Sequence, residues 1–206
     1  DAELGVAARA SLVARGFGQS LITVLANMGG AREGQAAFTA NGLQVRPFSD
    51  LNTLAIHCIS GPGAQVFSRL AGLPDEAFIH DGQMTKREVR AATLASLSPA
   101  PDQLLWDVGA GCGSIAIEWM RSCRGCEAIA FEANDGRSRM IAENADRLGT
   151  PRLRIVTGEA PATLARQASP DAVFIGGGLG DPGLFEACWE ALEPGGIMAA
   201  NVISIE

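Results

Sequence analysis

The sequence is short of charge, of basic clusters and of long apolar runs, and each shortage excludes a class of protein. Charged residues make up 19% of the 206 residues, and the formal net charge is −7. The longest basic run is Lys86-Arg87, which argues against nucleic-acid binding, because neutralising phosphates takes clustered Lys and Arg. No apolar stretch reaches the roughly 20 residues that a membrane-spanning helix needs. With 47% hydrophobic residues, the chain is expected to be a folded globule.

Cysteine and histidine are also scarce. The 5 cysteines are odd in number and irregular in spacing, which fits a reducing compartment. The N-terminus begins with Asp1 and Glu3, which is not a signal-peptide pattern. These observations predict a cytoplasmic protein.

Cys123 and Cys126 form a CxxC pair. A zinc site would need a second pair or two histidines at ligand spacing, and His57 and His80 lie far upstream and far from each other. A thioredoxin-like pair should open a helix, whereas this pair falls between an expected helix and the next strand. We therefore expect neither a metal site nor a redox role.

The most informative stretch that is present runs from Asp107 to Gly113, directly after the apolar run 104–106 and before a helix expected at 114–120. One glycine permits a tight turn, another lets a ligand lie against bare backbone, and the helix N-terminus is expected to offer N–H groups. A dinucleotide fingerprint would need its third glycine at position 114, which is Ser114, so a nicotinamide dehydrogenase is disfavoured. The compact form with a preceding Asp resembles motif I of class I S-adenosylmethionine methyltransferases.

Glu132 ends the next apolar strand, expected at 127–131. An acidic residue at this spacing in a doubly wound domain is placed to meet a ribose diol. The glycine turn and Glu132 together predict an adenosine-containing cofactor.

From Thr85 onward, strand and helix patterns alternate regularly, which predicts right-handed crossovers and a mostly parallel, doubly wound Rossmann-like α/β sheet. Thr85 opens a capping box with Glu88, and Asn134 and Asp181 are expected helix caps. The expected strands are the one that begins with the apolar run 104–106 and leads into the glycine motif, then 127–131, 154–157, 172–175 and 197–203. The expected helices are 85–97, 114–120, 134–148, a short one from 161, and 182–192.

Residues 1–72 carry one helix pattern and two strand patterns, at 20–25 and 52–59, too few for an independent domain. Residues 73–84 are expected to be a linker, and 85–206 the methyltransferase domain. A class I methyltransferase normally adds a helix and an antiparallel hairpin after the fifth strand, so we expect this sequence to be truncated at its C-terminus.

Gly176, Gly177 and Gly178 follow the fourth strand of the domain, where many methyltransferases place polar residues. This loop supplies no base, but it allows a broad flat substrate to approach the backbone; a plain flexible loop is the alternative. Four segments, at 80–90, 107–114, 158–161 and 174–178, together resemble the C-terminal, decarboxylating half of the precorrin-6Y C5,15-methyltransferase family. Residues 4–60 resemble the last part of that family's other half, a tetrapyrrole methylase.

The resemblance implies methylation of carbon 15 of a precorrin with loss of carbon dioxide from the ring C acetate, in cobalamin biosynthesis, by a homotetramer. Because most of the tetrapyrrole methylase half is absent from the sequence, carbon 5 should not be methylated. The residue that assists decarboxylation does not follow from the sequence. The resemblance implies that S-adenosylmethionine contacts Thr85, Gly109, Ala110, Gly111, Cys112, Gly113, Glu132 and Ala160.

Lys86 and Arg90 lie on one face of the helix that begins near Thr85, so we predict that they hold substrate carboxylates, with Gly176, Gly177 and Gly178 along the macrocycle. Two alternatives remain open. One is a class I methyltransferase of another small molecule or of a protein, which a substrate screen would separate. The other is a non-catalytic scaffold, which S-adenosylhomocysteine should not stabilise.

Overall fold

The computed structural model describes residues 2–42 and 49–202. Its contacts divide the chain into two compact units, 1–67 and 68–206. No helix among the described residues is both long and apolar enough to cross a membrane.

The first unit consists of one helix and an antiparallel sheet in the order β2-β1-β3. The expected helix and both expected strands are present, as α1 (Ala2–Ala14), β1 (Leu21–Ala26) and β3 (Asn52–His57). The strand β2 (Gly34–Thr39) was not expected, because its sequence Gly-Gln-Ala-Ala-Phe-Thr has little β-branched or apolar character. It forms because β1 supplies it with a hydrogen-bonding edge.

The second unit is a five-stranded parallel sheet in the order β6-β5-β4-β7-β8. Its strands are β4 (Leu104–Val108), β5 (Glu127–Glu132), β6 (Arg154–Thr157), β7 (Ala172–Ile175) and β8 (Ile197–Ala200). All neighbouring pairs are parallel, as the regular alternation predicts. The expected fifth strand ran to Ile203, which lies outside the described residues.

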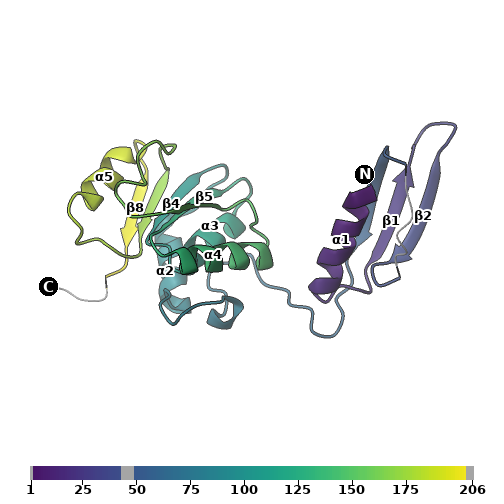
Figure 1. Ribbon diagram of the computed structural model, residues 1–206, viewed down its shortest axis with the longest axis horizontal. Coiled ribbons are helices and arrows are strands. Elements are labelled where there is room, and N and C mark those ends of the chain that lie inside the picture. Colours follow the sequence, from purple (N-terminus) through teal and green to yellow (C-terminus); the bar gives the residue numbers. More distant parts are fainter. Residues whose placement is uncertain (1, 43–48, 203–206) are drawn as a thin grey trace. The chain divides into compact units, whose positions relative to one another are not determined.

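The helices cover both faces of this sheet (Figure 1). The helices α2 (Arg87–Leu97), α3 (Ser114–Ser122) and α4 (Asp135–Arg147) contact one another in sequence along one face, and α5 (Leu184–Ala191) covers the other. The last helix begins at Leu184 with Gly183 as its cap, two residues later than expected. The sequence also predicted a short helix from Pro161, but residues 160–166 form turns, and the last of them, Arg166, has a positive φ of 74°.

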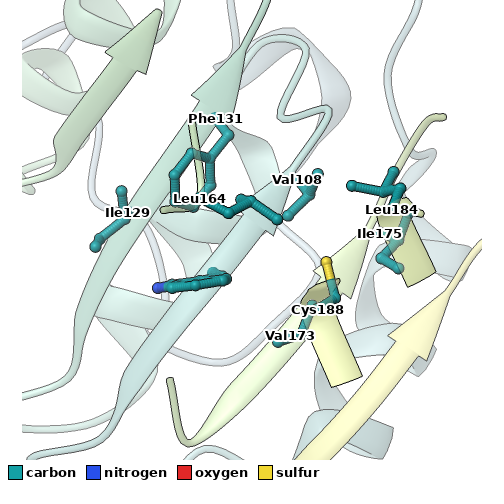
Figure 2. Packing of buried hydrophobic residues seen from close by; sticks show 9 residues of the cluster. Val108, Ile129, Phe131, Leu164, Val173, Ile175, Leu184 and Cys188 are labelled. Carbon is teal, nitrogen blue, oxygen red and sulfur yellow. The ribbon is translucent and has the colours of Figure 1, made fainter. Parts of the chain in front are cut away.

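The alternation of side chains along the buried strands separates a structural face from a functional one. Trp106, Val108, Ile129, Phe131, Val173 and Ile175 point toward α5 and form one apolar cluster with Leu164, Leu184 and Cys188 (Figure 2). The rings of Trp106 and Phe131 meet edge to face at 5.4 Å between centroids. Asp107 alternates to the opposite face, where α3 begins.

The segment predicted as a linker, residues 73–84, instead packs against the second unit. Leu73, Ala77 and Phe78 are buried, and a short 3-10 helix, η1 (Asp75–Ala77), interrupts the segment. The sequence showed only a polar, Pro-containing stretch between two patterned regions. In the fold, Arg90 of α2 lies over the ring of Phe78, and Glu118 of α3 and Asn144 of α4 accept backbone N–H groups of the segment.

Thr85 is not the cap of α2. The helix begins one residue later than the capping-box pattern indicates, with Lys86 at the cap position and no side-chain hydrogen bond to the cap. The carbonyl of Thr85 accepts a hydrogen bond from the Arg90 guanidinium over 2.6 Å, which turns the chain away from the helix at this point.

Candidate functional site

A cavity of about 1210 Å³ lies at the carboxyl ends of β4, β5 and β7 in the second unit. This is where a parallel doubly wound sheet places its ligands, because the strand order reverses beside the first strand. Most of the residues that the sequence singles out line it: Thr85, Lys86, Gly109, Ala110, Gly111, Glu132, Ala160, Gly176, Gly177 and Gly178. Cys112, Gly113 and Arg90 do not.

The glycine turn after β4 is tied to β5 by its own N–H groups. The N–H groups of Gly109 and Ala110 both donate to the carbonyl of Phe131 over 3.0 Å, and that of Gly111 donates to Glu132 Oε2 over 2.8 Å. These three donors are therefore used within the protein, and none of them belongs to the helix N-terminus that the sequence analysis expects to offer N–H groups. What the turn presents to the cavity is bare Cα surface.

Gly111 and Gly113 have different reasons to be glycine. Both have positive φ, but a Cβ on Gly111 would meet only the carbonyl oxygen of Gln83, 3.6 Å away, so this position faces the cavity. A Cβ on Gly113 would lie 2.8 Å from Cγ2 of Ile141 on α4. Gly113 thus allows α3 and α4 to pack closely, and it does not line the cavity.

Cys112 points into the protein interior. Its thiol is buried, which raises the thiol pKa, and its carbonyl accepts a hydrogen bond from Asn144 over 3.0 Å. Within the turn, the residues that line the cavity are Gly109, Ala110 and Gly111, and Cys112 does not. A contact between Cys112 and the cofactor stays a prediction.

Glu132 lies at the end of β5 with its carboxylate nearly buried at the cavity wall. Its two oxygens accept one backbone N–H each, from Gly111 at 2.8 Å and from Asn134 at 3.0 Å. A carboxylate oxygen has two lone pairs, so each can still accept a hydroxyl. Asn134 caps α4 as expected, by accepting the N–H of Arg137.

Asp107 opens the glycine motif, but the sequence analysis did not assign it to the cofactor site. Its Oδ2 accepts the N–H of Ala116 in the first turn of α3 over 3.0 Å, and its Oδ1 has no partner among the described residues. Burial raises the pKa of Asp107 to about 7. The hydrogen bond from Ala116 lowers this pKa, and the negative charge of Glu132 raises it further. An Asp within a buried strand was the signal in the sequence.

The triple glycine after β7 packs against the first glycine turn. A Cβ on Gly109 would lie 2.8 Å from the nitrogen of Gly177, and one on Gly176 would lie 2.9 Å from the carbonyl oxygen of Gly109. Two loops therefore touch backbone to backbone. A Cβ on Gly177 would meet nothing within 4 Å, so this glycine leaves the cavity wall open.

Arg90 cannot hold a substrate. Its side chain has 0% exposure, and its guanidinium is paired with Glu118 at 2.6 Å and with Asp75 at 3.1 Å. Glu118 and Asp75 enclose the Arg90 side chain only in the folded protein. The i, i+4 spacing of Lys86 and Arg90 therefore could not predict that Arg90 is buried. The Lys86 side chain is 58% exposed, 3.8 Å from Asp75, and lines the cavity as expected.

Arg137 on α4 is a cavity-lining cation that the sequence analysis missed. It donates to Asp81 Oδ2 over 2.8 Å and to Gln83 Oε1 over 2.7 Å. The hydrogen bond from the Gln83 N–H and, next, the one from Arg137 lower the pKa of Asp81. The only signal was that Asp81 and Gln83 belong to one of the segments that carry the family resemblance.

Cys123 and Cys126 lie between α3 and β5, where the sequence places them, and are joined as a disulfide. Neither residue lines the cavity. Across residues 2–42 and 49–202, no group of three or more His, Cys, Asp or Glu side chains could hold a metal ion.

The profile of the precorrin methyltransferase domain matches residues 76–206. A curated precorrin-6Y C(5,15)-methyltransferase (decarboxylating) of Sinorhizobium sp is 46% identical over 195 residues, which cover 95% of this chain and 47% of the relative. A cobalt-precorrin-6B C(15)-methyltransferase (decarboxylating) of Salmonella typhimurium is 36% identical over 134 residues, which cover 64% of this chain and 69% of that protein. The chain therefore spans about half the length of the precorrin-6Y relative.

Among solved structures, the C-terminal domain of precorrin-6Y C5,15-methyltransferase from Rhodobacter capsulatus matches with a TM-score of 0.63 and 46% identity, and the match covers 68% of this chain and 74% of that one. The second unit has the class I methyltransferase fold, as its strand order and helices predict. With the profile match and these relatives, the chain belongs to the precorrin methyltransferase domain family.

Proposed function

We propose that this chain binds S-adenosylmethionine in the cavity of its second unit and methylates carbon 15 of a precorrin, with loss of carbon dioxide from the ring C acetate. The observation that carries the proposal is the cavity. It joins the Gly111 turn and Glu132 to the open backbone of Gly177 in one space, in a chain whose relatives are named for this reaction.

The residues present fit the adenosyl cofactor. Gly111 leaves bare backbone where a side chain would fill the cavity, and the Glu132 oxygens, each holding one N–H, keep lone pairs for the two hydroxyls of a ribose. The volume of about 1210 Å³ exceeds the roughly 300 to 1,000 Å³ of ordinary small-molecule pockets. That size supports a cofactor and part of a second, larger ligand.

The sulfonium of the bound cofactor would supply the methyl group. The carbon that receives it belongs to an electron-rich macrocycle, so the protein's main task is to orient the two reactants and exclude water. The backbone at Gly177 lets a flat ring approach without a side chain in the way. Lys86, exposed at the cavity wall, attracts the substrate carboxylates. Loss of carbon dioxide leaves an electron pair on the former acetate carbon, which takes up a proton.

Two measurements test the proposal. S-adenosylhomocysteine at about 100 times its dissociation constant should raise the free energy of unfolding by about 2.7 kcal/mol. Incubation with a precorrin substrate and methyl-labelled cofactor should place label on carbon 15 and release carbon dioxide. If the protein binds the cofactor but transfers the methyl group to another substrate, the proposed precorrin substrate is rejected and the methyltransferase activity is retained. No stabilisation would leave the non-catalytic scaffold.

We also propose a homotetramer in the cytoplasm. The family resemblance of residues 74–206 supports the tetramer. The irregular cysteine spacing supports the location, whereas the Cys123–Cys126 disulfide opposes it. Light scattering of the purified chain tests the first, and cell fractionation the second.

A further inference from the structure

Residues 72–86, here called the strap, reach the cavity with their last five residues. Gln83, Met84, Thr85 and Lys86 all line it. The carbonyl oxygen of Gln83 lies 3.6 Å from the point where a Cβ on Gly111 would stand. The separation between the strap and the glycine turn therefore decides how much room a ligand has against Gly111.

A buried ion pair fixes both ends of the strap. Glu118 accepts the N–H groups of Gly72 and Leu73 over 2.6 and 3.0 Å. Its partner Arg90 donates to the carbonyls of Leu73 and Thr85 and lies over the ring of Phe78, 4.9 Å from its centroid. The ends of the strap are thus held by α2 and α3, and its middle is held separately.

Asn144, on α4 and with 0% exposure, holds the middle of the strap. Its Oδ1 accepts the N–H of Ile79 over 2.8 Å, and its Nδ2 donates to the carbonyl of Ile79 over 2.8 Å. The same Nδ2 donates to the carbonyl of Cys112 in the glycine turn over 3.0 Å. One side chain therefore joins the strap to the glycine turn, and each of these two segments contributes other residues to the cavity lining.

The buried amide of Asn144 links two separate segments of the chain. The Asn144 oxygen and nitrogen are bonded to Ile79 of the strap and Cys112 of the turn. A buried amide whose bonds are satisfied fixes the relative position of what it connects, because breaking one bond leaves an unpaired polar group in the interior. Asn144 itself does not line the cavity, so its influence on a ligand must pass through Ile79 and Cys112.

We propose that Asn144 is a positioning residue for the adenosyl cofactor: by joining the strap to the glycine turn, it holds the cavity at the width that the cofactor needs. This inference rests on the proposed function. The hydrogen bonds of the Asn144 side chain go to Ile79 and Cys112 and not to the loop of Gly177, so we expect the residue to set cofactor affinity and leave the substrate wall unchanged.

The first experiment measures S-adenosylhomocysteine binding by calorimetry on the full chain, in the parent, in Asn144→Ala and in Ser138→Ala. The control residue Ser138 is also buried on α4, but its hydroxyl accepts a hydrogen bond from Thr157 of β6, and it does not line the cavity. Asn144→Ala should raise the dissociation constant about tenfold, the equivalent of 1.4 kcal/mol, while Ser138→Ala leaves it unchanged. The KM for the macrocycle should not change in either variant.

The second experiment uses the parent protein, so it does not depend on a variant that folds. If the cofactor binds more tightly when the strap is joined to the glycine turn, then bound cofactor must in return stabilise that joined state. Saturation with S-adenosylhomocysteine should therefore slow hydrogen exchange of the Ile79 amide several-fold, although Ile79 does not line the cavity.

Equal affinities in all three proteins, or an Ile79 amide that exchanges at the same rate with and without ligand, would overturn the positioning role and leave the proposed function intact. A parent protein that does not bind S-adenosylhomocysteine would overturn both.

Discussion

The N–H of Gly111 donates to Glu132 Oε2 over 2.8 Å, so the acidic residue at the end of β5 holds the glycine turn that follows β4. The second oxygen of Glu132 holds the N–H of Asn134, where α4 begins. One carboxylate thus connects two strand ends and two helix starts around the cavity. It both shapes the site and, in the proposed function, accepts the ribose hydroxyls.

Replacing Glu132 by Ala should weaken S-adenosylhomocysteine binding by about 1 to 3 kcal/mol, because the ribose hydroxyls lose a charged acceptor and the turn loses its anchor. Glu132→Gln separates the two roles. Its amide oxygen can still accept the Gly111 N–H, so the loss should be smaller than in Glu132→Ala. Calorimetry on both variants checks this, and an unchanged affinity in Glu132→Ala would place the ribose contact elsewhere.

Gly111 and Gly113 should fail in different ways when substituted. Gly111→Val should abolish cofactor binding, because its side chain would enter the cavity and its positive φ is strained for a β-branched residue. Gly113→Ala should instead lower the free energy of unfolding by about 1 to 3 kcal/mol, because its Cβ would collide with Ile141. Thermal unfolding and calorimetry on each variant compare the two effects. A Gly113→Ala protein that is stable but does not bind would return Gly113 to the cofactor site.

Lys86→Ala should raise the KM for a polycarboxylate macrocycle and leave cofactor affinity intact. It should also flatten the salt dependence of turnover, because salt screens the attraction between an exposed cation and the substrate carboxylates. The matched control is Arg139→Ala, which removes an exposed cation of α4 that does not line the cavity. If both variants keep the parent's salt dependence, Lys86 does not attract the substrate.

Arg90→Met should destabilise the protein by about 3 to 5 kcal/mol, because Glu118 would remain as a buried charge without its partner. Adding Glu118→Gln removes that charge, so the double variant should be more stable than the sum of the two single effects predicts. Chemical denaturation of all four proteins measures the coupling. Additive effects would show that the pair contributes no interaction energy.

Asp107 should make the protein less stable as the pH rises. Its folded pKa of about 7 lies above its ordinary 3.8, so between these values the folded state binds more proton than the unfolded state. The free energy of unfolding should fall as the pH rises from about 4 to about 7 and become level above that. The difference of about 3 pKa units corresponds to on the order of 4 kcal/mol.

Denaturation of Asp107→Asn across the same pH range checks this, because an amide oxygen keeps the Ala116 hydrogen bond without titrating. Asp81→Asn, which removes an exposed carboxyl, should retain the fall. A parent whose stability is level from pH 4 to 7 would contradict the buried, protonated Asp107.

The sequence by itself determined the order of strands and helices in the second unit, because those signals are local. Apolar runs mark β4 to β8, Asn134 caps α4, and the glycines after β4 and β7 mark the two loops that meet at the cavity. Glu132 could be assigned to the site for the same reason, since the end of a buried parallel strand can be read from its residues. The strand β2 could not be predicted from its residues, because its strand conformation depends on pairing with β1.

Tertiary structure alone decided which polar residues reach the cavity and which hold it together. Arg90 and Lys86 look alike in the sequence, yet one is enclosed by Glu118 and Asp75 and the other is exposed. Gly113 serves helix packing because Ile141 lies against it, and residues 73–84 pack against the second unit because Asn144 binds Ile79 and Arg90 binds Leu73. Each outcome depends on a neighbour distant in sequence, and burial and hydrogen bonding are set by that neighbour, not by the residue's own pattern.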